Sequence, residues 1–209
     1  MALPMIAPPP VRREEPDLPA EGGPWPAQGE WTYEDYLRLP DDGRRYEIIQ
    51  GVLYVTAAPR FNHQYVVGEL FAALRAYVRE RGLGVVIPAP FEVHLGERIR
   101  PVQPDLIFLR AERQPSPEAG HFEGAPDLVV EVLSPSTART DRVVKFWVYE
   151  QSGVPEYWIV DPHARSVEIY LLREGIYTLH GQYVGSETLT SPTFPELALP
   201  VQSLFPELT

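Results

Sequence analysis

Residues 102–109 read VQPDLIFL and residues 125–133 read APDLVVEVL, and these two stretches decide the fold class. Each is short, rich in apolar and β-branched residues, and punctuated by proline, which is typical of a buried β-strand. The run GLGVVIPAPFEVHL at residues 82–95 has the same character. We therefore expect the three runs to form strands of one sheet.

One helix is predicted before these strands in the chain and one after them. The first begins at Asn62, which we take as its N-cap, and stops at Gly82. Apolar residues at helical spacings of three and four follow at Val67, Leu70, Phe71, Leu74 and Val78. The second helix opens at Thr140 and Asp141 and closes at Gly153. The order of strands and helices predicts an α/β domain.

The segment before the first helix contains two shorter elements. Thr32 is a candidate cap for a short helix, with Asp35 three residues on and Pro40 at its end. Residues 44–59 read RRYEIIQGVLYVTAAP, which predicts two extended runs joined by a turn at residues 50–51. We interpret this segment as a hairpin.

The rest of the chain is divided by its prolines and glycines. Residues 110–125 are expected to form a loop, residues 154–190 a meander of three strands, and residues 191–209 irregular structure with short turns. Residues 1–30 contain 8 of the 24 prolines and little periodicity, so we expect an extended or mobile arm there. Residues 31–209 are then a single domain.

The composition excludes several classes of protein. With no cysteine there is no disulfide, no thiolate nucleophile and no cysteine-ligated metal. No stretch approaches the ~18 uncharged apolar residues of a membrane span, and the opening MALPMIAPPP lacks the basic start of a secretory signal. We expect a cytoplasmic protein without a membrane partner. Its net charge of −11 weakens a prediction of nucleic-acid binding, although carboxylates that bind metal themselves add negative charge.

Two acidic residues lie in predicted buried strands. Asp105 starts one apolar strand, and Glu131 lies near the end of another. A carboxylate among apolar neighbours is costly to desolvate unless it is paired or binds a metal. Two such acids on neighbouring strands suit a shared Mg²⁺ ion. The alternative is that each caps a strand end or pairs with an arginine. The common nucleotide-binding, serine-hydrolase and HExxH motifs are absent.

Lys145 is the third candidate, on the second helix, 14 residues after Glu131. A strand, a short turn and one helical turn would return its ammonium group toward the acids. There it would activate water or neutralise developing phosphorane charge. The alternative is an ordinary solvated helix surface. Arginine fills 17 of the 18 basic positions, so a single lysine here favours the functional interpretation.

Several strings of the chain resemble one known family. They are YEIIQG, NHQYVVGEL, QPDLIF, EGAPDLVVEVLSPST, DRVVKFWVYEQSGVPEYWIVD and LTSPTFPEL, and together they extend over residues 31–208. In this order they look like the Uma-two family of bacterial restriction endonucleases, part of the PD-(D/E)XK nuclease superfamily. The resemblance implies a restriction-endonuclease-like core, a central mixed sheet flanked by helices, and phosphodiester cleavage that depends on Mg²⁺ or Mn²⁺.

The same resemblance assigns roles to residues. It implies that Asp105 is the PD acid, that Glu131 is the second acid, and that Glu47 in YEIIQG is a candidate third metal ligand. The superfamily pattern would place lysine at position 133, where this chain has Leu133. In such cases the lysine migrates to the following helix, which is the position that Lys145 fills.

Four further residues are weaker candidates. Gln103 lies two residues before Asp105, where its amide would orient a metal water, although a surface role serves as well. His63 would contact phosphate at the start of the first helix; the alternative is a structural role in capping or packing that helix. Arg139 and Arg142 would hold the scissile strand, and a solvated helix face explains them equally.

Three functions are therefore considered. The first is a metal-dependent endonuclease that acts on nucleic acid, with DNA as the expected substrate; a homodimer that joins two basic strips would offset the acidic charge. The second is a catalytically silent module of the same fold that binds nucleic acid or protein. The third is a glycoside hydrolase with Asp105 and Glu131 as acid and base, which leaves Lys145 without a task.

Overall fold

The computed structural model describes residue 18 and residues 23–207. Most of the predicted arm at residues 1–30 therefore lies outside the described residues. The described part of the arm contacts the domain. The Gln28 side chain accepts a hydrogen bond of 2.8 Å from the backbone N–H of Leu53 and donates one of 3.1 Å to the Leu53 carbonyl. The division at residue 30 stays a prediction.

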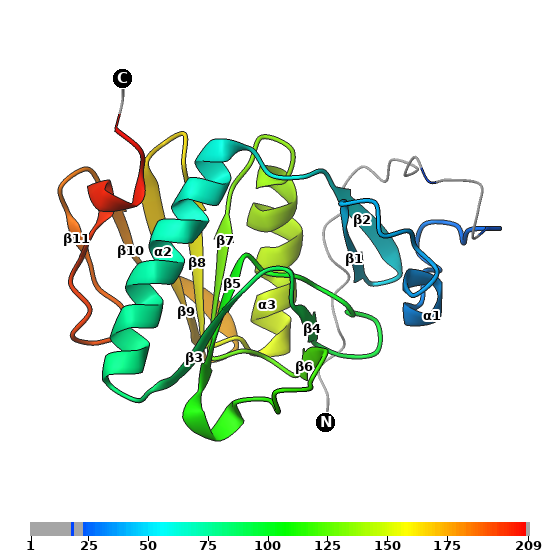
Figure 1. Ribbon diagram of the computed structural model, residues 1–209, viewed down its shortest axis with the longest axis horizontal. Helices are drawn as coiled ribbons and strands as arrows, with labels where there is room; N and C mark the ends of the chain where they lie inside the picture. The colour runs from blue at the N-terminus through cyan, green and yellow to red at the C-terminus, as the bar shows by residue number, and fades with distance from the viewer. Residues whose placement is uncertain (1–17, 19–22, 208–209) are drawn as a thin grey trace.

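A six-stranded mixed sheet forms the centre of the molecule (Figure 1). Its strands, in spatial order, are β10 (Ile176–Val184), β9 (Ser166–Arg173), β8 (Glu156–Asp161), β7 (Leu128–Val132), β5 (Leu106–Arg110) and β3 (Gly84–Pro88). β7 and β8 are parallel, while the other neighbours are antiparallel. The α/β class and the central mixed sheet are as predicted, and β8, β9 and β10 form the expected meander.

Helices cover the two faces of this sheet. α2 (Phe61–Glu80) packs on one face, where side chains of β5 and β7 such as Leu106 and Val130 join its buried stripe. The opposite face is covered by the π-helix η2 (Thr140–Lys145) and by α3 (Phe146–Ser152) (Figure 1). Because strand side chains alternate between faces, Glu131 lies on the face that η2 and α3 cover.

A hairpin lies beside one end of the sheet. It consists of β1 (Arg45–Ile49) and β2 (Val52–Thr56), joined at Gln50 and Gly51, whose φ angles of 54° and 73° fit a two-residue hairpin turn. Next to it, α1 (Tyr33–Tyr36) has the predicted capping box of Thr32 and Asp35. The short helix ends at Tyr36, before Pro40.

Several sequence predictions need correction. The run 82–95 gives two strands, because after β3 the chain leaves the sheet near Pro90, and β4 (Glu92–His94) pairs instead with β6 (His121–Glu123) in a separate parallel pair. The stretch 110–125 is therefore not all loop; it holds β6 and the 3₁₀-helix η1 (Ala111–Arg113).

The helix boundaries also differ in detail. Asn62 is not the N-cap of α2, since Arg60 occupies that position without a side-chain cap bond. The stop at Gly82 is as expected, with φ of 62°. The C-terminal segment contains β11 (Thr188–Leu189), β12 (Leu199–Pro200) and the 3₁₀-helix η3 (Val201–Leu204). Within residues 18 and 23–207, no helix has the length and apolar character of a membrane span.

Candidate active site

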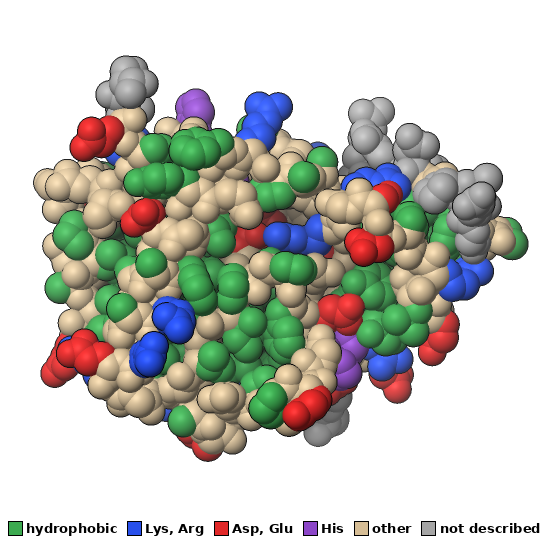
Figure 2. Space-filling view, viewed as in Figure 1, with side chains coloured by type: hydrophobic (Ala, Val, Ile, Leu, Met, Phe, Trp, Pro, Cys, Tyr) green, Lys and Arg blue, Asp and Glu red, His purple; other side chains and the backbone are tan. Residues whose placement is uncertain are grey.

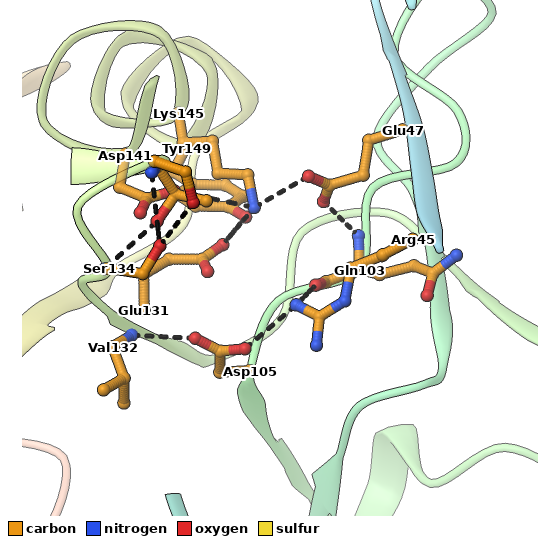
Figure 3. A network of polar contacts seen from close by, with 12 residues as sticks. Arg45, Glu47, Gln103, Asp105, Glu131, Val132, Ser134, Asp141, Lys145 and Tyr149 are labelled. Carbon is orange, nitrogen blue, oxygen red and sulfur yellow. Dashed lines mark hydrogen bonds and ion pairs between the residues drawn. The ribbon is translucent and has the colours of Figure 1, made fainter. Parts of the chain in front are cut away.

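The four principal candidates meet in one buried cluster (Figure 3). Asp105 immediately precedes β5, Glu131 lies in the adjacent β7, Glu47 comes from β1, and Lys145 ends η2. Each is 3% exposed or less. The two acids thus come from neighbouring strands of the sheet, and the hairpin brings the third acid from a distant part of the chain; a metal ion shared by Asp105 and Glu131 stays a prediction.

Lys145 lies between two of these acids. Its Nζ is 2.9 Å from Glu131 Oε1 and 3.0 Å from Glu47 Oε2, with Asp141 Oδ1 at 3.8 Å. The Tyr149 hydroxyl donates a further bond of 2.6 Å to Glu131 Oε1. These contacts, together with burial, exclude the alternative that Lys145 is a solvated surface residue.

The π-helix positions this lysine at the junction with α3. Residues 140–145 have π-helical hydrogen bonding, and regular α-helix begins at Phe146. Single π-turns inside helices are uncommon and occur frequently at functional sites. Here the π-turn contributes two members of the cluster, Asp141 and Lys145. The predicted helix is confirmed, but its first turns have this wider form.

Asp105 is held by a second set of partners. Its Oδ1 accepts a bond of 2.9 Å from Arg45, and its Oδ2 accepts one of 2.9 Å from the backbone N–H of Val132 and lies 3.1 Å from His63 Nε2. Burial alone would raise the pKa of Asp105, but the hydrogen bonds and positive charges of these partners lower it to about 2. Asp105 is therefore ionised at neutral pH.

His63 contacts the site through that carboxylate. Burial by itself would lower the pKa of the imidazole, yet the hydrogen bond and charge of Asp105 outweigh it and raise the pKa above its usual value. His63 Nδ1 is buried and has no hydrogen-bond partner among the described residues. The histidine is consequently a buried neighbour of Asp105 within α2, which agrees with a packing role; it does not cap the helix, and the phosphate contact stays a prediction.

The other acids are short of positive charge. Burial and the neighbouring carboxylates, against the opposing charge of Lys145, together raise the pKa of Glu131 to about 8 and that of Asp141 to about 6. For Lys145, burial would lower the pKa, but Glu131, Glu47 and Asp141 together raise it. The lysine is thus a cation in this arrangement, and its charge does not fully offset the effect of burial on Glu131 and Asp141.

Gln103 supports the site through its backbone. Its N–H donates a bond of 2.6 Å to Glu47 Oε1, which fixes the carboxylate opposite Lys145. Its side-chain amide instead donates to the Tyr36 hydroxyl, at 3.2 Å. The side chain is therefore directed to α1 and not to the acids, unlike the role considered from the sequence.

The structure does not bring Arg139 and Arg142 into the cluster. Arg139 is exposed, and Arg142 forms a bidentate pair with Glu168 of β9, with both distances 2.8 Å. Figure 2 shows acidic and basic side chains next to one another near the middle of the face that carries α2.

Sequence reasoning missed three members of the site: Arg45, Asp141 and Tyr149. A signal for each was present. Asp141, Lys145 and Tyr149 are spaced by four, which places them near one another on a helix. Arg45 lies two residues before Glu47, so both side chains point to the same face of β1.

The donor chemistry of the cluster fits a hard divalent cation. Glu47, Asp105 and Glu131 supply carboxylate oxygens, and Asp141 adds another beside them. Oxygen ligands of this kind select Mg²⁺ and Mn²⁺ over metals that prefer sulfur. Because the pKa values of Glu131 and Asp141 are raised, a positive charge added beside them would be stabilised and would displace their protons.

Comparisons with known proteins agree with this architecture. A crystal structure of "a putative nuclease belonging to DUF820" from Anabaena variabilis is similar over 83% of this chain and 97% of its own, with a TM-score of 0.70 and 22% sequence identity. The comparison with curated proteins gave no match. The family described as "Uma2: Putative restriction endonuclease" matches residues 33–202. The chain therefore belongs to the Uma2 family.

Proposed function

We propose that the protein is an endonuclease that hydrolyses phosphodiester bonds of nucleic acid, with DNA as substrate and Mg²⁺ or Mn²⁺ as cofactor. One observation carries the proposal: Lys145 Nζ lies about 3 Å from both Glu131 and Glu47, and Asp105 immediately precedes the adjoining strand β5. A lysine among strand-borne acids is the combination that phosphoryl transfer uses. The family description supports the same activity.

The residues divide into metal ligands and positioning groups. Glu47, Asp105 and Glu131 would hold the ion, with Asp141 beside them. When bound, the ion supplies Lewis acidity toward a phosphoryl oxygen and toward the attacking water. The backbone N–H of Gln103 holds Glu47 in place for this role.

Lys145 would stabilise the negative charge that develops on the substrate phosphate. Its ammonium group offers three donors at the point where the acids converge, and a phosphoryl oxygen beside it would gain a charge-assisted hydrogen bond as negative charge develops. Tyr149 donates to the Glu131 oxygen that also contacts Lys145, and so orients that carboxylate. Arg45 has a side chain that is 22% exposed, so it is the cation of the cluster nearest to solvent and to an incoming backbone phosphate.

A binding module without turnover is the second candidate. The observation in its favour is that Glu47, Asp105 and Glu131 are each 3% exposed or less and already contact Lys145, Arg45 or His63. Cleavage requires the substrate phosphate to reach these oxygens, and the hairpin β1–β2 that carries Glu47 and Arg45 must yield to admit it. The predicted homodimer stays a prediction.

The test is cleavage of supercoiled plasmid and of single-stranded RNA with Mg²⁺, Mn²⁺ or chelator. We expect plasmid nicking that needs either metal and falls by about 10²–10⁴-fold in Lys145→Met, since a charge-stabilising group contributes about this much. Arg139→Met is the matched control, because it removes an exposed cation from the start of the same helix. Retarded migration of DNA without cleavage by the wild type would instead establish the binding module, and RNA cleavage alone would overturn the choice of DNA.

A further inference from the structure

A second group of potential ligands lies apart from the acidic cluster, on the parallel pair β4 and β6. His94 of β4 faces His121 and Glu123 of β6, with donor atoms that all lie within 4.8 Å of one another. The two imidazole rings are stacked, with centroids 4.1 Å apart and an interplanar angle of 7°. Figure 2 shows histidine between acidic side chains on this face, next to β6.

The spacing of the donor atoms suits a tetrahedral ion. Glu123 Oε1 is 3.3 Å from His94 Nδ1 and 3.1 Å from His121 Nε2. Ligands about 2.0–2.1 Å from a tetrahedral Zn²⁺ are roughly 3.3 Å from each other. Two of the donor separations thus match tetrahedral spacing. Because an imidazole binds a metal in the plane of its ring and the two rings are stacked in parallel, the half-exposed His121 ring would have to turn to bring its Nε2 to the same ion as His94 Nδ1.

His94 provides an independent observation. Both of its ring nitrogens face carboxylates, since Nε2 is 3.0 Å from Glu92 Oε2 and Nδ1 is 3.3 Å from Glu123 Oε1. A neutral imidazole carries one N–H and satisfies one carboxylate, whereas an imidazolium would donate to both. The ring is buried, with 3% of its side chain exposed, and a metal cation between Nδ1 and Glu123 would take the place of the second proton.

Glu92 is itself fixed in place. The hydroxyl groups of Tyr33 and Tyr36 in α1 donate to its two oxygens, at 3.0 and 2.9 Å. A carboxylate on the second nitrogen of a metal-binding histidine is a recurrent arrangement that sets the tautomer and raises the basicity of the ligand. Here it would place a proton on Nε2 of His94 and direct the Nδ1 lone pair toward Glu123.

We propose that His94, His121 and Glu123 form a binding site for Zn²⁺, with a water molecule as the fourth ligand. Two imidazoles and one carboxylate favour Zn²⁺ and related transition metals, whereas the all-carboxylate cluster favours Mg²⁺ or Mn²⁺. The ion clamps β4 to β6. Through Glu92 and Tyr36 it also braces α1, whose Tyr36 hydroxyl accepts from Gln103, the residue that holds Glu47.

The experiment uses Co²⁺ as a spectroscopic probe for the full chain, after chelator treatment and in excess Mg²⁺ to occupy the carboxylate site. We expect the visible absorption of tetrahedral Co²⁺, saturating at one ion and displaced by Zn²⁺. His121→Ala and Glu123→Gln should weaken binding by more than about tenfold. Both side chains are 41% exposed or more, so these variants are expected to fold. His180→Ala removes an exposed histidine from β10 and is the matched control.

Three results would overturn the proposal. The first is a wild-type protein that binds no Co²⁺ or Zn²⁺ under these conditions. The second is binding that His121→Ala leaves unchanged or that His180→Ala abolishes, which would assign the ion to another histidine. The third is a His94 ring that holds protons on both nitrogens by NMR when Zn²⁺ is in excess, because a proton would then occupy the position assigned to the metal. None of these readouts depends on nuclease activity.

Discussion

Replacing Lys145 by methionine removes the ammonium group that lies 2.9 Å from Glu131 and 3.0 Å from Glu47, and keeps a side chain of similar length. Both carboxylates stay 3% exposed or less, so neither gains full hydration in exchange. Removing one partner of a buried ion pair costs about 3–5 kcal/mol. Because domains of this kind have about 5–15 kcal/mol of stability in all, the variant should unfold at markedly lower urea concentration.

The cost should depend on pH. The pKa of Glu131 is already raised to about 8, so in the variant, where Lys145 no longer pairs with it, the Glu131 carboxylate becomes protonated and neutral. Uptake of this proton becomes easier by about 1.4 kcal/mol for each unit of lower pH. We therefore expect a larger loss of stability at pH 8 than at pH 5.5 when both are measured by urea unfolding with chelator present.

A double-mutant cycle measures the interaction energy between Lys145 and Glu131. Lys145→Met combined with Glu131→Gln should be less unstable at pH 8 than Lys145→Met alone, since the glutamine leaves no buried charge at position 131. Arg139→Met, on the exposed side of the same helix, should stay within about 0.5 kcal/mol of the wild type. A loss below about 1 kcal/mol in Lys145→Met at pH 8 would refute the view that this ammonium group holds the acids together.

Three other predictions concern the rest of the molecule. In chelator, the free energy of unfolding of the wild type, measured by urea titration, should fall as the pH rises from about 5 to about 8. Folding raises the pKa of Glu131 to about 8 and that of Asp141 to about 6, so the unfolded chain releases these protons at lower pH than the folded chain does. Added Mg²⁺ should remove this decline. Gln28→Ala loses two bonds to the backbone of β2 and should lower the melting temperature by roughly 2–4 °C in calorimetry, whereas no change would show that these residues do not brace the hairpin. Gly84→Ala should destabilise by about 3 kcal/mol or more in the same assay, because φ is 146° and the new Cβ would lie 2.0 Å from the Leu109 carbonyl oxygen; Gly120→Ala, with nothing within 4 Å, is its control.

The sheet and its principal helices could be predicted because their signals are local. β5, which follows Asp105, and β7, which contains Glu131, are apolar runs, and α2 has a regular apolar stripe that ends near a glycine with positive φ. The separate pair β4 and β6 could not be found in this way. Its strands are three residues each and depend on each other across 26 intervening residues (95–120), so no pattern within either one distinguishes a strand from a loop.

The site could be predicted in part. Acids inside apolar strands are conspicuous, and the single lysine of the chain is equally so. The partners of Asp105 could not be predicted from the sequence. Arg45 and His63 are separated from Asp105 by 60 and 42 residues, and only the folded hairpin and α2 bring them next to it. The π-turn that places Lys145 is likewise invisible to a reading based on helical periods of 3.6.

A crystal of the protein grown or soaked with Mn²⁺, with anomalous scattering recorded, tests the central claim most directly. The account predicts a Mn²⁺ peak about 2.1–2.2 Å from carboxylate oxygens of both Asp105 and Glu131, with Glu47 as a third ligand or hydrogen-bonded to a bound water. Lys145 should remain within hydrogen-bond reach of Glu131 or Glu47. Crystals that show Mn²⁺ only elsewhere, with Asp105 still paired to Arg45 and Glu131 to Lys145, would contradict a metal-dependent active site in this cluster.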